Sequence, residues 1–414
     1  MKGKKRVLSL FSGCGGMDIG FEGGFRCLRR SINTTIHPDW IREEDGKWVT
    51  VADTGFETVF ANDIRPDAKA AWVSYFSDRY EDANERYHIE SIVDLVKRAK
   101  SNENVFPQNI DIVTGGFPCQ DFSVAGKRKG FRSDKSHNGG RLDIGEPTVE
   151  SRGQLYMWMR EAVSILQPAV FIAENVKGLT TLEDAKAVIE HDFADAADGG
   201  YVVIPARVLH AANYGVPQSR ERVIFYGFKR RALKDEALAA LLDVASNPEY
   251  DPYPLPTHAF NVEGDGLDPF VTCMEALEDL PEPDQALDPA QTKYSKAKFL
   301  PKGQGNIEIK PNAVSPTIRS EHHGNIEFRR LSAENGGLHQ EELARGLQQR
   351  RLTVRECARI QTFPDDYQFI LDKTPLNKAV SASDAYKIIG NAVPCVLGYH
   401  IAMRLAENWD KYFA

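Results

Sequence analysis

The sequence predicts an α/β fold, with a mostly parallel sheet in a large domain and a smaller, irregular second domain. Strand-like and helix-like runs alternate through the first half of the chain, which is the pattern of βαβ units. The pattern changes after Phe228, because residues 229–350 are rich in Pro, Gly and charged residues. A chain of 414 residues also exceeds what one small core requires and suits two domains of unequal size.

The first strand is expected at residues 6–11, a short apolar run that ends at a glycine-rich turn. Further strands are expected at 58–61, 110–114, 170–173 and 222–228, and helices at 17–24, 66–80, 90–100 and 153–167. Order returns at 351–363 and around 388–394, so we assign 1–228 and 351–414 to the large domain and 229–350 to the smaller one. Ligands bind beyond the carboxyl ends of open parallel sheets, and polar or glycine residues follow the first four strands. The sequence therefore predicts one site at that edge.

The turn after the first strand, FSGCGG from Phe11 to Gly16, is rich in glycine. Glycine lets the backbone approach a ligand closely and presents N–H groups at a helix N-terminus. The turn is not a Walker P-loop, because the Gly-Lys-Ser/Thr end is absent, and it matches a dinucleotide fingerprint only loosely. Asp63, which closes the second strand, could hold ribose hydroxyls. A purely structural turn is the alternative interpretation.

Cys119 stands in the segment GGFPCQDFS, which follows the third strand. Pro118 fixes the backbone before it, so the loop is expected to expose the thiol to the cleft. Cationic residues such as those at 127–129 can lower a thiol pKa and contact phosphate. The alternative is a buried cysteine, which is how we interpret Cys27, Cys273, Cys357 and Cys395. The six cysteines include no Cys-x-x-Cys pair, so they suggest neither a zinc site nor a disulfide framework.

Glu174 and Asn175 end the fourth strand. A carboxylate beside a nucleophile suits general acid work or a hydrogen bond to a ring nitrogen, while a helix cap is the alternative. In the run QSRER, the alternating residues Gln218, Arg220 and Arg222 are expected to share one face of a strand. Such a face fits an anionic or base-edge ligand, and a salt-bridged edge strand is the alternative.

Taken in order, these segments resemble the motifs of bacterial DNA (cytosine-5) methyltransferases of type II restriction-modification systems. The segments are FSGCGG, the Asn62-Asp63 strand end, GGFPCQDFS, SRGQL, ENV, NYGVPQSRER, RLTVRECARIQTFPD and IGNAVP. They span residues 6–228 and 351–398, and the Pro-Cys-Gln, Glu-Asn-Val and Gln-x-Arg-x-Arg motifs are together highly specific. The resemblance implies a Rossmann-like S-adenosylmethionine-dependent methyltransferase domain, with a target-recognition domain at 229–350.

The resemblance implies S-adenosylmethionine as methyl donor, which leaves as S-adenosylhomocysteine, and implies no metal. The implied cofactor-binding residues are Phe11, Gly13, Cys14, Gly15, Asp63, Ile64, Ile89, Gly116, Pro118, Leu155, Asn391, Ala392 and Val393. Asp63 would hold the ribose and Ile64 would contact the adenine. Two positions depart from the family pattern: Asp63 stands where Glu is frequent, and His88-Ile89 stands where an Asp-Ile pair usually contacts the adenine amino group.

The implied catalytic residues are Cys119, Glu174, Arg220 and Arg222. Cys119 would attack C6 of a flipped-out cytosine, because C5 is a poor nucleophile until C6 is attacked and neither atom is accessible within a duplex. Glu174 would hold the base through N3 and its amino group. Arg222 would reach the cytosine O2, and Arg220 would support the catalytic loop.

The implied DNA contacts are Gln120, Ser123, Lys127, Arg128, Gln218, Arg319, His322 and His323. Residues 261–290 carry nine acidic residues and no Lys or Arg, whereas 293–330 hold eight Lys or Arg residues against three Glu. We therefore place the groove-facing side in the basic half, where Arg319 would suit a guanine edge. Solvated surface is the alternative interpretation of this charge pattern. Arg355 and Glu356 would brace the domain junction. Insertions at 26–55 and 132–149 have no functional interpretation.

The formal net charge of -8 argues against a surface coated in positive charge, but a local basic face is enough for nucleic acid. With no signal h-region and no segment of membrane-span length, we expect a cytoplasmic monomer. Its expected partners are double-stranded DNA and, in the same system, a cognate restriction endonuclease. One alternative is a transfer-RNA cytosine methyltransferase, whose Cys-Phe-Thr signature is not found here. The other is a non-enzymatic DNA-binding protein, against which the intact Cys119, Glu174 and Arg222 argue.

Overall fold

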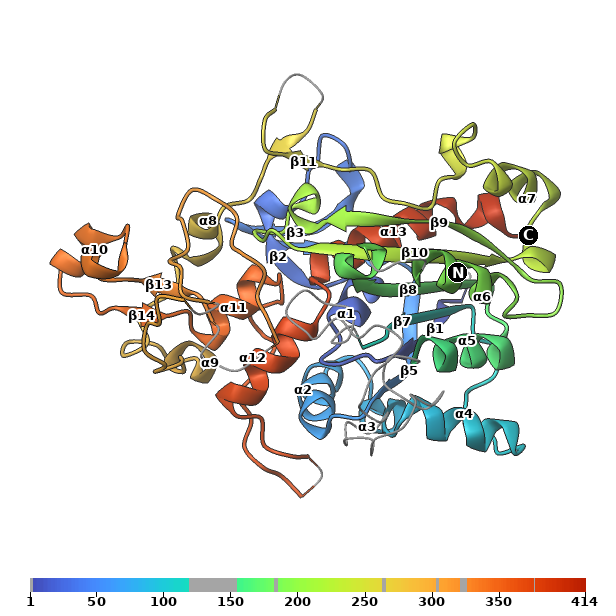
Figure 1. The fold of residues 1–414 in the computed structure, drawn as a ribbon, viewed down its shortest axis with the longest axis horizontal. Helices are drawn as coiled ribbons and strands as arrows, with labels where there is room; N and C mark the ends of the chain where they lie inside the picture. The colour runs from blue at the N-terminus through green and yellow to red at the C-terminus, as the bar shows by residue number, and fades with distance from the viewer. Residues whose placement is uncertain are drawn as a thin grey trace.

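The computed structural model describes residues 3–118, 155–181, 185–262, 266–302, 305–320, 326–375 and 377–414. In this part of the chain a seven-stranded sheet of order β6-β5-β1-β7-β8-β10-β9 forms the centre of the large domain (Figure 1). Its strands are β1 (Lys5–Leu10), β5 (Phe56–Asp63), β6 (Tyr87–Ile89), β7 (Ile112–Gly116), β8 (Val170–Val176), β9 (Tyr201–His210) and β10 (Glu221–Lys229). The first five in sheet order are parallel, and β10 is antiparallel to both β8 and β9. The predicted Rossmann-like, mostly parallel sheet is confirmed.

Strands β6 and β9 were not predicted. Strand β9 lies at the sheet edge and contains Pro205, and its pairing with β10 shifts register between Ile224 and Tyr226. Proline cannot donate to a strand ladder and is confined to edges and bulges, so the segment did not resemble a strand in sequence.

Helices cover both faces of the sheet (Figure 1). One face packs against α1 (Gly16–Glu22), α2 (Pro66–Phe76) and α13 (Cys395–Tyr412), and the other against α4 (Ile92–Lys100), α5 (Leu155–Leu166) and α6 (Ala185–Ala194). Successive residues of β1 serve opposite faces: Val7 belongs to the first hydrophobic cluster and Leu8 to the second. This alternation is the period of two that a strand imposes. The short helix α3 (Ala83–Arg86) precedes β6.

Helix α13 returns the end of the chain to the first helix. A Cβ at Gly20 would lie 2.5 Å from the carbonyl oxygen of Cys395, so α1 and α13 approach each other closely only because residue 20 has no side chain. The helical stretch Ala382–Tyr412, which includes α12 (Ala382–Asn391), is long and apolar enough to cross a membrane. Its apolar window is 78% buried inside the protein, as is typical of a core helix.

The insertion at 26–55 forms a small antiparallel sheet of order β2-β4-β3, with strands β2 (Arg26–Leu28), β3 (Ile41–Asp45) and β4 (Trp48–Val51). Its side chains hold residues of the segment 257–279. The Asn33 amide donates to the carbonyl oxygens of Thr257 (3.0 Å) and Gly266 (2.8 Å), and Lys47 Nζ lies 2.7 Å from Asp279 Oδ1. The insertion therefore connects the large domain to the start of the irregular region.

The segment 229–350 begins on the large domain, because α7 (Asp235–Leu242) packs against β9 and α13. Its later elements lie to one side of the sheet (Figure 1). They are β11 (His258–Ala259), β12 (Asp268–Pro269), α8 (Cys273–Leu277), α9 (Pro289–Thr292), β13 (Phe328–Arg330), α10 (Gln340–Ala344) and β14 (Arg350–Arg351), and they adjoin α11 (Val354–Ile360).

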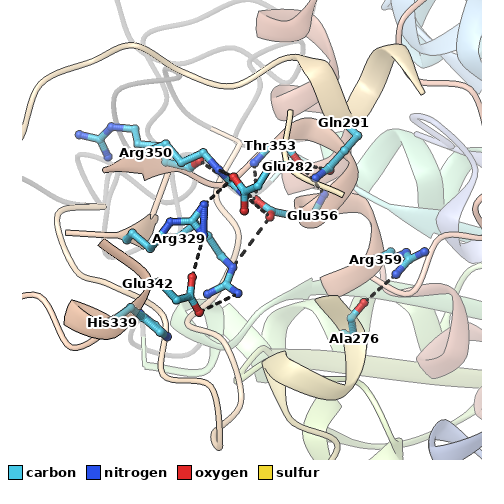
Figure 2. A network of polar contacts seen from close by, with 12 residues as sticks. Ala276, Glu282, Gln291, Arg329, His339, Glu342, Arg350, Thr353, Glu356 and Arg359 are labelled. Carbon is cyan, nitrogen blue, oxygen red and sulfur yellow. Dashed lines mark hydrogen bonds and ion pairs between the residues drawn. The ribbon is translucent and has the colours of Figure 1, made fainter. Parts of the chain in front are cut away.

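A buried network of alternating charges holds these short elements together (Figure 2). Arg350 Nη1 lies 2.8 Å from Glu356 Oε2 on α11, and Arg350 Nε lies 3.1 Å from Glu282 Oε2. Arg330 bridges Glu282 (2.5 Å) and Glu342 (2.7 Å). Burial opposes ionisation of Glu356, but the Arg350 guanidinium holds the pKa of that carboxyl below its ordinary value. Each buried charge thus has a partner of opposite sign.

Candidate active site

A cavity of about 490 Å³ opens at the carboxyl ends of β1, β5, β7 and β8, the edge at which the site was predicted. The predicted site residues that line it are Phe11, Gly13, Asp63, Ile64, Gly116, Pro118, Leu155, Glu174, Arg220, Arg222, Arg319, Asn391, Ala392 and Val393. The described residues Cys14, Gly15, Ile89 and Gln218 do not line it. The predicted residues Cys119, Gln120, Ser123, Lys127, Arg128, His322 and His323, and the 132–149 insertion, lie outside the described residues.

Buried hydrogen bonds fix the glycine-rich turn, residues 11–16, with its backbone facing the cavity. Gly13 has φ 55°, and a Cβ there would meet nothing within 4 Å, so its backbone faces open space. The Tyr87 hydroxyl donates to the Gly13 carbonyl oxygen (2.8 Å). The buried Asp18 carboxylate accepts hydrogen bonds from Ser9 (2.6 Å) and Ser12 (2.5 Å). The turn is therefore pre-organised.

Asp18 was not singled out in the sequence, although an acid in the first turn of the helix after FSGCGG is a recognisable signal. The Trp72 indole also donates to it, at 2.8 Å. Burial raises the pKa of the Asp18 carboxyl, and the hydrogen bonds from Ser12, Ser9 and Trp72 oppose that shift. Asp18 is a structural acid beneath the cavity floor.

Cys14 and Gly15 face the protein interior rather than the cavity. The Cys14 thiol is fully buried and donates to the Ile388 carbonyl oxygen (3.3 Å), and burial raises the pKa of this thiol. A Cβ at Gly15 would lie 2.6 Å from the Trp72 ring. The Cys14 side chain and the Cβ position of Gly15 thus pack under the turn, and the cofactor contact expected at both residues stays a prediction.

Asp63 lies where a ligand hydroxyl could reach it. Its carboxylate accepts the backbone N–H groups of Gly13 (3.1 Å) and Arg65 (3.0 Å), and burial raises its pKa against these hydrogen bonds. Each carboxylate oxygen has two lone pairs, so acceptor sites remain. Ile64 is 44% exposed beside it in the cavity wall, whereas the equally exposed Ile89 lies outside the wall.

Glu174 and Arg222 form a buried pair across two strands. Arg222 Nε lies 2.7 Å from Glu174 Oε1, with side chains only 11% and 10% exposed. Burial raises the pKa of Glu174, and the Arg222 and Arg220 guanidinium groups oppose that shift. The pair sets an acidic and a cationic group side by side in the cavity wall.

Gly116 makes room for that pair. Strand β7 places Gly116 opposite Glu174 on β8. A Cβ at residue 116 would lie 2.8 Å from Glu174 Oε2. The next residue along β8 also serves the site, because the Asn175 amide donates to the Phe117 carbonyl oxygen (3.0 Å) and so fixes the chain just before Pro118. Asn175 was noted in the sequence only as part of a strand end.

Arg220 is fully buried and holds two distant segments of the cavity wall. It donates to the carbonyl oxygens of Ile318 (3.0 Å), Gly390 (2.8 Å) and Ala392 (2.8 Å). These bonds join the residues before β10 to the C-terminal motif IGNAVP. Among the described residues, its contacts identify Arg220 as a brace of the wall.

Gln218 and Arg220 both precede β10, which begins at Glu221, and both side chains bind the backbone of Ile318. The Gln218 side chain is fully buried: the amide donates to Gln361 Oε1 (2.8 Å), and its oxygen accepts the Ile318 N–H (2.9 Å). The buried side chain gives no support to the DNA contact expected at Gln218, which stays a prediction.

A further wall segment, residues 317–320, was not anticipated as part of the cavity. Ser219 N–H donates to the Ser315 carbonyl oxygen (2.7 Å), and the Thr317 hydroxyl donates to the Ser219 carbonyl oxygen (2.6 Å). The segment is about 100 residues from Ser219 in sequence, and no local pattern marks a contact over such a separation.

The geometry defines the class of the protein first. A cavity at the carboxyl ends of a Rossmann-like sheet, with a glycine turn and a strand-end carboxylate, is typical of an enzyme that binds a nucleoside-containing cofactor. Residues 45–407 match the family described as C-5 cytosine-specific DNA methylase, and the chain belongs to that family. It is a DNA (cytosine-5-)-methyltransferase, with DNA as its substrate and a methyl donor of the S-adenosylmethionine type.

Curated relatives place the chain in the restriction-modification setting. It is 30% identical over 414 residues to Type II methyltransferase M.BsuRI of Bacillus subtilis, covering 98% of this chain and 80% of the relative. It is 32% identical to Type II methyltransferase M.BspRI of Lysinibacillus sphaericus, covering 99% of this chain and 83% of the relative.

Solved structures show the same fold at low sequence identity. A putative DNA modification methyltransferase encoded within an Escherichia coli prophage has 20% identity and a TM-score of 0.53, with 98% of this chain and 99% of that chain covered. Methyltransferase EhMeth of Entamoeba histolytica has 14% identity and a TM-score of 0.54, with 99% of each chain covered.

Proposed function

We propose that the enzyme transfers the methyl group of S-adenosylmethionine to C5 of a cytosine flipped out of a specific short duplex sequence. The observation that carries the proposal is the Glu174–Arg222 pair, 2.7 Å apart in the cavity wall. A flipped cytosine presents N3 and its amino group beside O2. A carboxyl group side by side with a guanidinium complements that edge, with Glu174 on N3 and the amino group and Arg222 on O2.

Cys119 would supply the nucleophile. Its Sγ forms a bond to C6, and the electron pair of the C5–C6 double bond moves to C5, which takes the methyl group. A base then removes the C5 proton, the double bond re-forms and the thiolate leaves. Cys119 lies outside the described residues; the support is its Pro-Cys-Gln motif and the position of its neighbours Phe117 and Pro118 in the cavity wall.

Glu174 would assist the attack by holding a proton at N3. Burial raises the pKa of this carboxyl, which favours the protonated form. A proton shared with N3 withdraws electron density from the ring and makes C6 more electrophilic. Arg222 would keep the base oriented while this happens.

The described wall residues fit the proposed cofactor. The cavity volume lies in the range of small-molecule sites. Asp63 has acceptor sites for ribose hydroxyls, the exposed face of Ile64 suits an adenine ring, and the open backbone at Gly13 allows close approach. When bound, the cofactor supplies an electrophilic methyl group. Asn391, Ala392 and Val393 would close the site from the C-terminal end.

We also propose residues 229–350 as the target-recognition domain. The support is that its later elements stand beside the sheet and contribute residues 317–320 to the cavity wall (Figure 1). A cytoplasmic monomer that acts alongside a separate restriction endonuclease is the arrangement we propose for the cell.

The test is bisulfite sequencing of plasmid DNA from cells that express the wild-type protein, Cys119→Ala or Glu174→Gln. We expect protected cytosines in one short context, lost with Cys119→Ala and strongly reduced with Glu174→Gln. The matched control is Glu221→Gln, a carboxylate at the start of β10 that pairs with Lys177 outside the cavity. Protection that survives Cys119→Ala would refute the covalent route. Soluble wild-type protein that protects no cytosine would point to an RNA substrate or a required partner.

A further inference from the structure

Arg319 occupies a fixed place in the cavity wall. Its guanidinium Nη1 lies 3.0 Å from Glu327 Oε1, and the Glu327 side chain has no exposed surface, whereas that of Arg319 is 32% exposed. A Cβ at Gly390 would lie 2.3 Å from the Arg319 carbonyl carbon, so the two backbones are in contact. Arg220 holds the preceding carbonyl, of Ile318, at 3.0 Å. Backbone and side chain are thus both positioned.

The other arginines of the wall are committed to different partners. Arg222 pairs with Glu174 and also donates to the Glu221 carbonyl oxygen, and Arg220 binds three carbonyl oxygens. Arg65 pairs with Asp67. Among contacts to described residues, Arg319 uses one of its five N–H donors, on Glu327. Arg65 is about as exposed as Arg319, but its backbone binds Asp63, where the cofactor ribose is proposed to lie. Arg319 is therefore the wall arginine that lies away from the proposed cofactor contacts and keeps donors for another anion.

We propose that Arg319 binds the DNA phosphate beside the flipped cytosine, with Glu327 as the residue that positions it. The inference rests on the proposed function, because a base drawn into the cavity leaves its own phosphate at the mouth. Arg319 lines the cavity from the segment 317–320. A guanidinium held by a carboxylate on one side offers its remaining donors to phosphate oxygens in a charge-assisted, two-pronged contact.

This role differs from the guanine contact expected from sequence. Base edges that specify a sequence are read in the grooves of the duplex, whereas phosphate contacts set position and register. Arg319 lines the cavity that would receive the flipped base. We therefore assign it to positioning the target nucleotide rather than to reading the neighbouring bases.

The test uses a duplex that contains the methylated sequence found by bisulfite sequencing, with either natural phosphates or a neutral methylphosphonate next to the target cytosine. With natural DNA, Arg319→Gln is expected to raise the DNA Kd by about 10- to 100-fold and to lower the slope of log Kd against log salt by about one. With the methylphosphonate duplex the wild type is expected to lose a similar factor, and Arg319→Gln to lose almost nothing further.

Glu327→Gln should give a smaller rise in Kd for natural DNA, with the cofactor Kd unchanged. Arg319→Lys, which keeps the charge but not the two-pronged contact, should bind DNA with intermediate affinity and provides a second test should Arg319→Gln fail to fold. Arg231→Gln is the matched control, because Arg231 is exposed just beyond the opposite end of β10 and pairs with Asp198. It should leave DNA affinity unchanged.

Three results would overturn the proposal. If the methylphosphonate weakened DNA binding equally in the wild type and in Arg319→Gln, then Arg319 would not contact that phosphate. A raised cofactor Kd with unchanged DNA affinity would assign Arg319 to the cofactor carboxylate. Methylation of altered DNA sequences by Arg319→Gln would instead support the guanine contact that was expected from the sequence. Wild-type methylation of the natural duplex is measured in the same series, so a failure of the proposed function is seen separately.

Discussion

Gly116 and Glu174 face each other across β7 and β8, and the place of a Cβ at residue 116 is 2.8 Å from Glu174 Oε2. The missing side chain lets the carboxyl group lie over the neighbouring strand and reach Arg222. The position of the acid thus depends on a glycine that has no polar group of its own.

Gly116→Ala should therefore slow methyl transfer without unfolding the protein. The added methyl group displaces the Glu174 carboxyl by a fraction of an ångström to about an ångström, and a misplacement of that size can cost about 100-fold in rate. Single-turnover kinetics on duplex DNA measure the step, and thermal unfolding serves as the control for stability. An unchanged rate would mean that the carboxyl position at 174 does not limit catalysis.

Arg220→Met should destabilise the protein more than a surface substitution does. The guanidinium satisfies the carbonyl oxygens of Ile318, Gly390 and Ala392, and its loss should cost about 3–5 kcal/mol of unfolding free energy. Urea unfolding checks this value. Arg231→Met, at an exposed pair with Asp198, should change it by less than about 0.5 kcal/mol. Arg220→Lys distinguishes a structural role from a catalytic one. It should recover part of the stability that Arg220→Met loses. If Arg220→Lys kept full activity although its stability were low, Arg220 would have no direct part in catalysis.

Asp18→Asn should change how stability depends on pH. Burial raises the folded-state pKa of Asp18 above its ordinary value of 3.8, so the folded protein holds a proton that the unfolded chain has released. Stability from this group is present below about pH 4 and is lost as the pH rises through the raised pKa. The free energy of unfolding of the wild type should thus fall relative to Asp18→Asn over that interval, measured by urea unfolding at several pH values. The exposed Asp78→Asn should run parallel to the wild type, and a parallel Asp18→Asn curve would contradict the raised pKa.

Arg350→Met should weaken DNA binding while leaving cofactor binding intact. It removes the nearer partner of the buried Glu356 carboxylate, 2.8 Å away, and leaves Arg329 at 4.0 Å, so the cost in stability should be at most about 3–5 kcal/mol (Figure 2). The network lies away from the cavity wall, so the cofactor Kd should stay unchanged. The DNA Kd should rise, because the network orders the segment 229–350 that we propose as the target-recognition domain. Titrations of both ligands test this. The double variant Arg350→Met/Glu356→Leu should regain part of the stability, since no buried charge is then left without its partner. An equal loss of cofactor affinity would show that the network supports the whole protein rather than only residues 229–350, the proposed target-recognition domain.

Much of the cavity could be predicted from the sequence, because many of its lining residues lie at the carboxyl ends of predicted parallel strands. Asp63, Gly116 and Glu174 come directly after apolar runs, and parallel strands bring their carboxyl ends to one edge whatever the connections between them. The family motifs then indicated that Arg222 and Asn391 belong to the same site. Local pattern and fold rule were sufficient for these residues.

The remainder depends on which way a side chain turns and on contacts between distant segments. Cys14 directly follows the cavity residue Gly13 in sequence, but the left-handed turn directs its thiol inward to the Ile388 carbonyl oxygen. Gln218 fails as a strand residue because β10 begins three residues later. Thr317 and Arg319 reach the wall from a separate region, and no periodicity in their own segment encodes that contact.

The three-part wall of the cavity has a consequence for how the protein is made. Arg220 joins residues near 318 to residues 390–392, so the enclosure needs the strand ends of the first half of the chain together with two segments that are synthesised much later. On the ribosome the early strands can collapse as they emerge, but the pocket has no far side until Asn391 has left the exit tunnel. A chain interrupted before that point has the strand-end residues but lacks the wall that Arg220 braces, so we expect the nascent polypeptide to stay inactive until the IGNAVP segment has emerged.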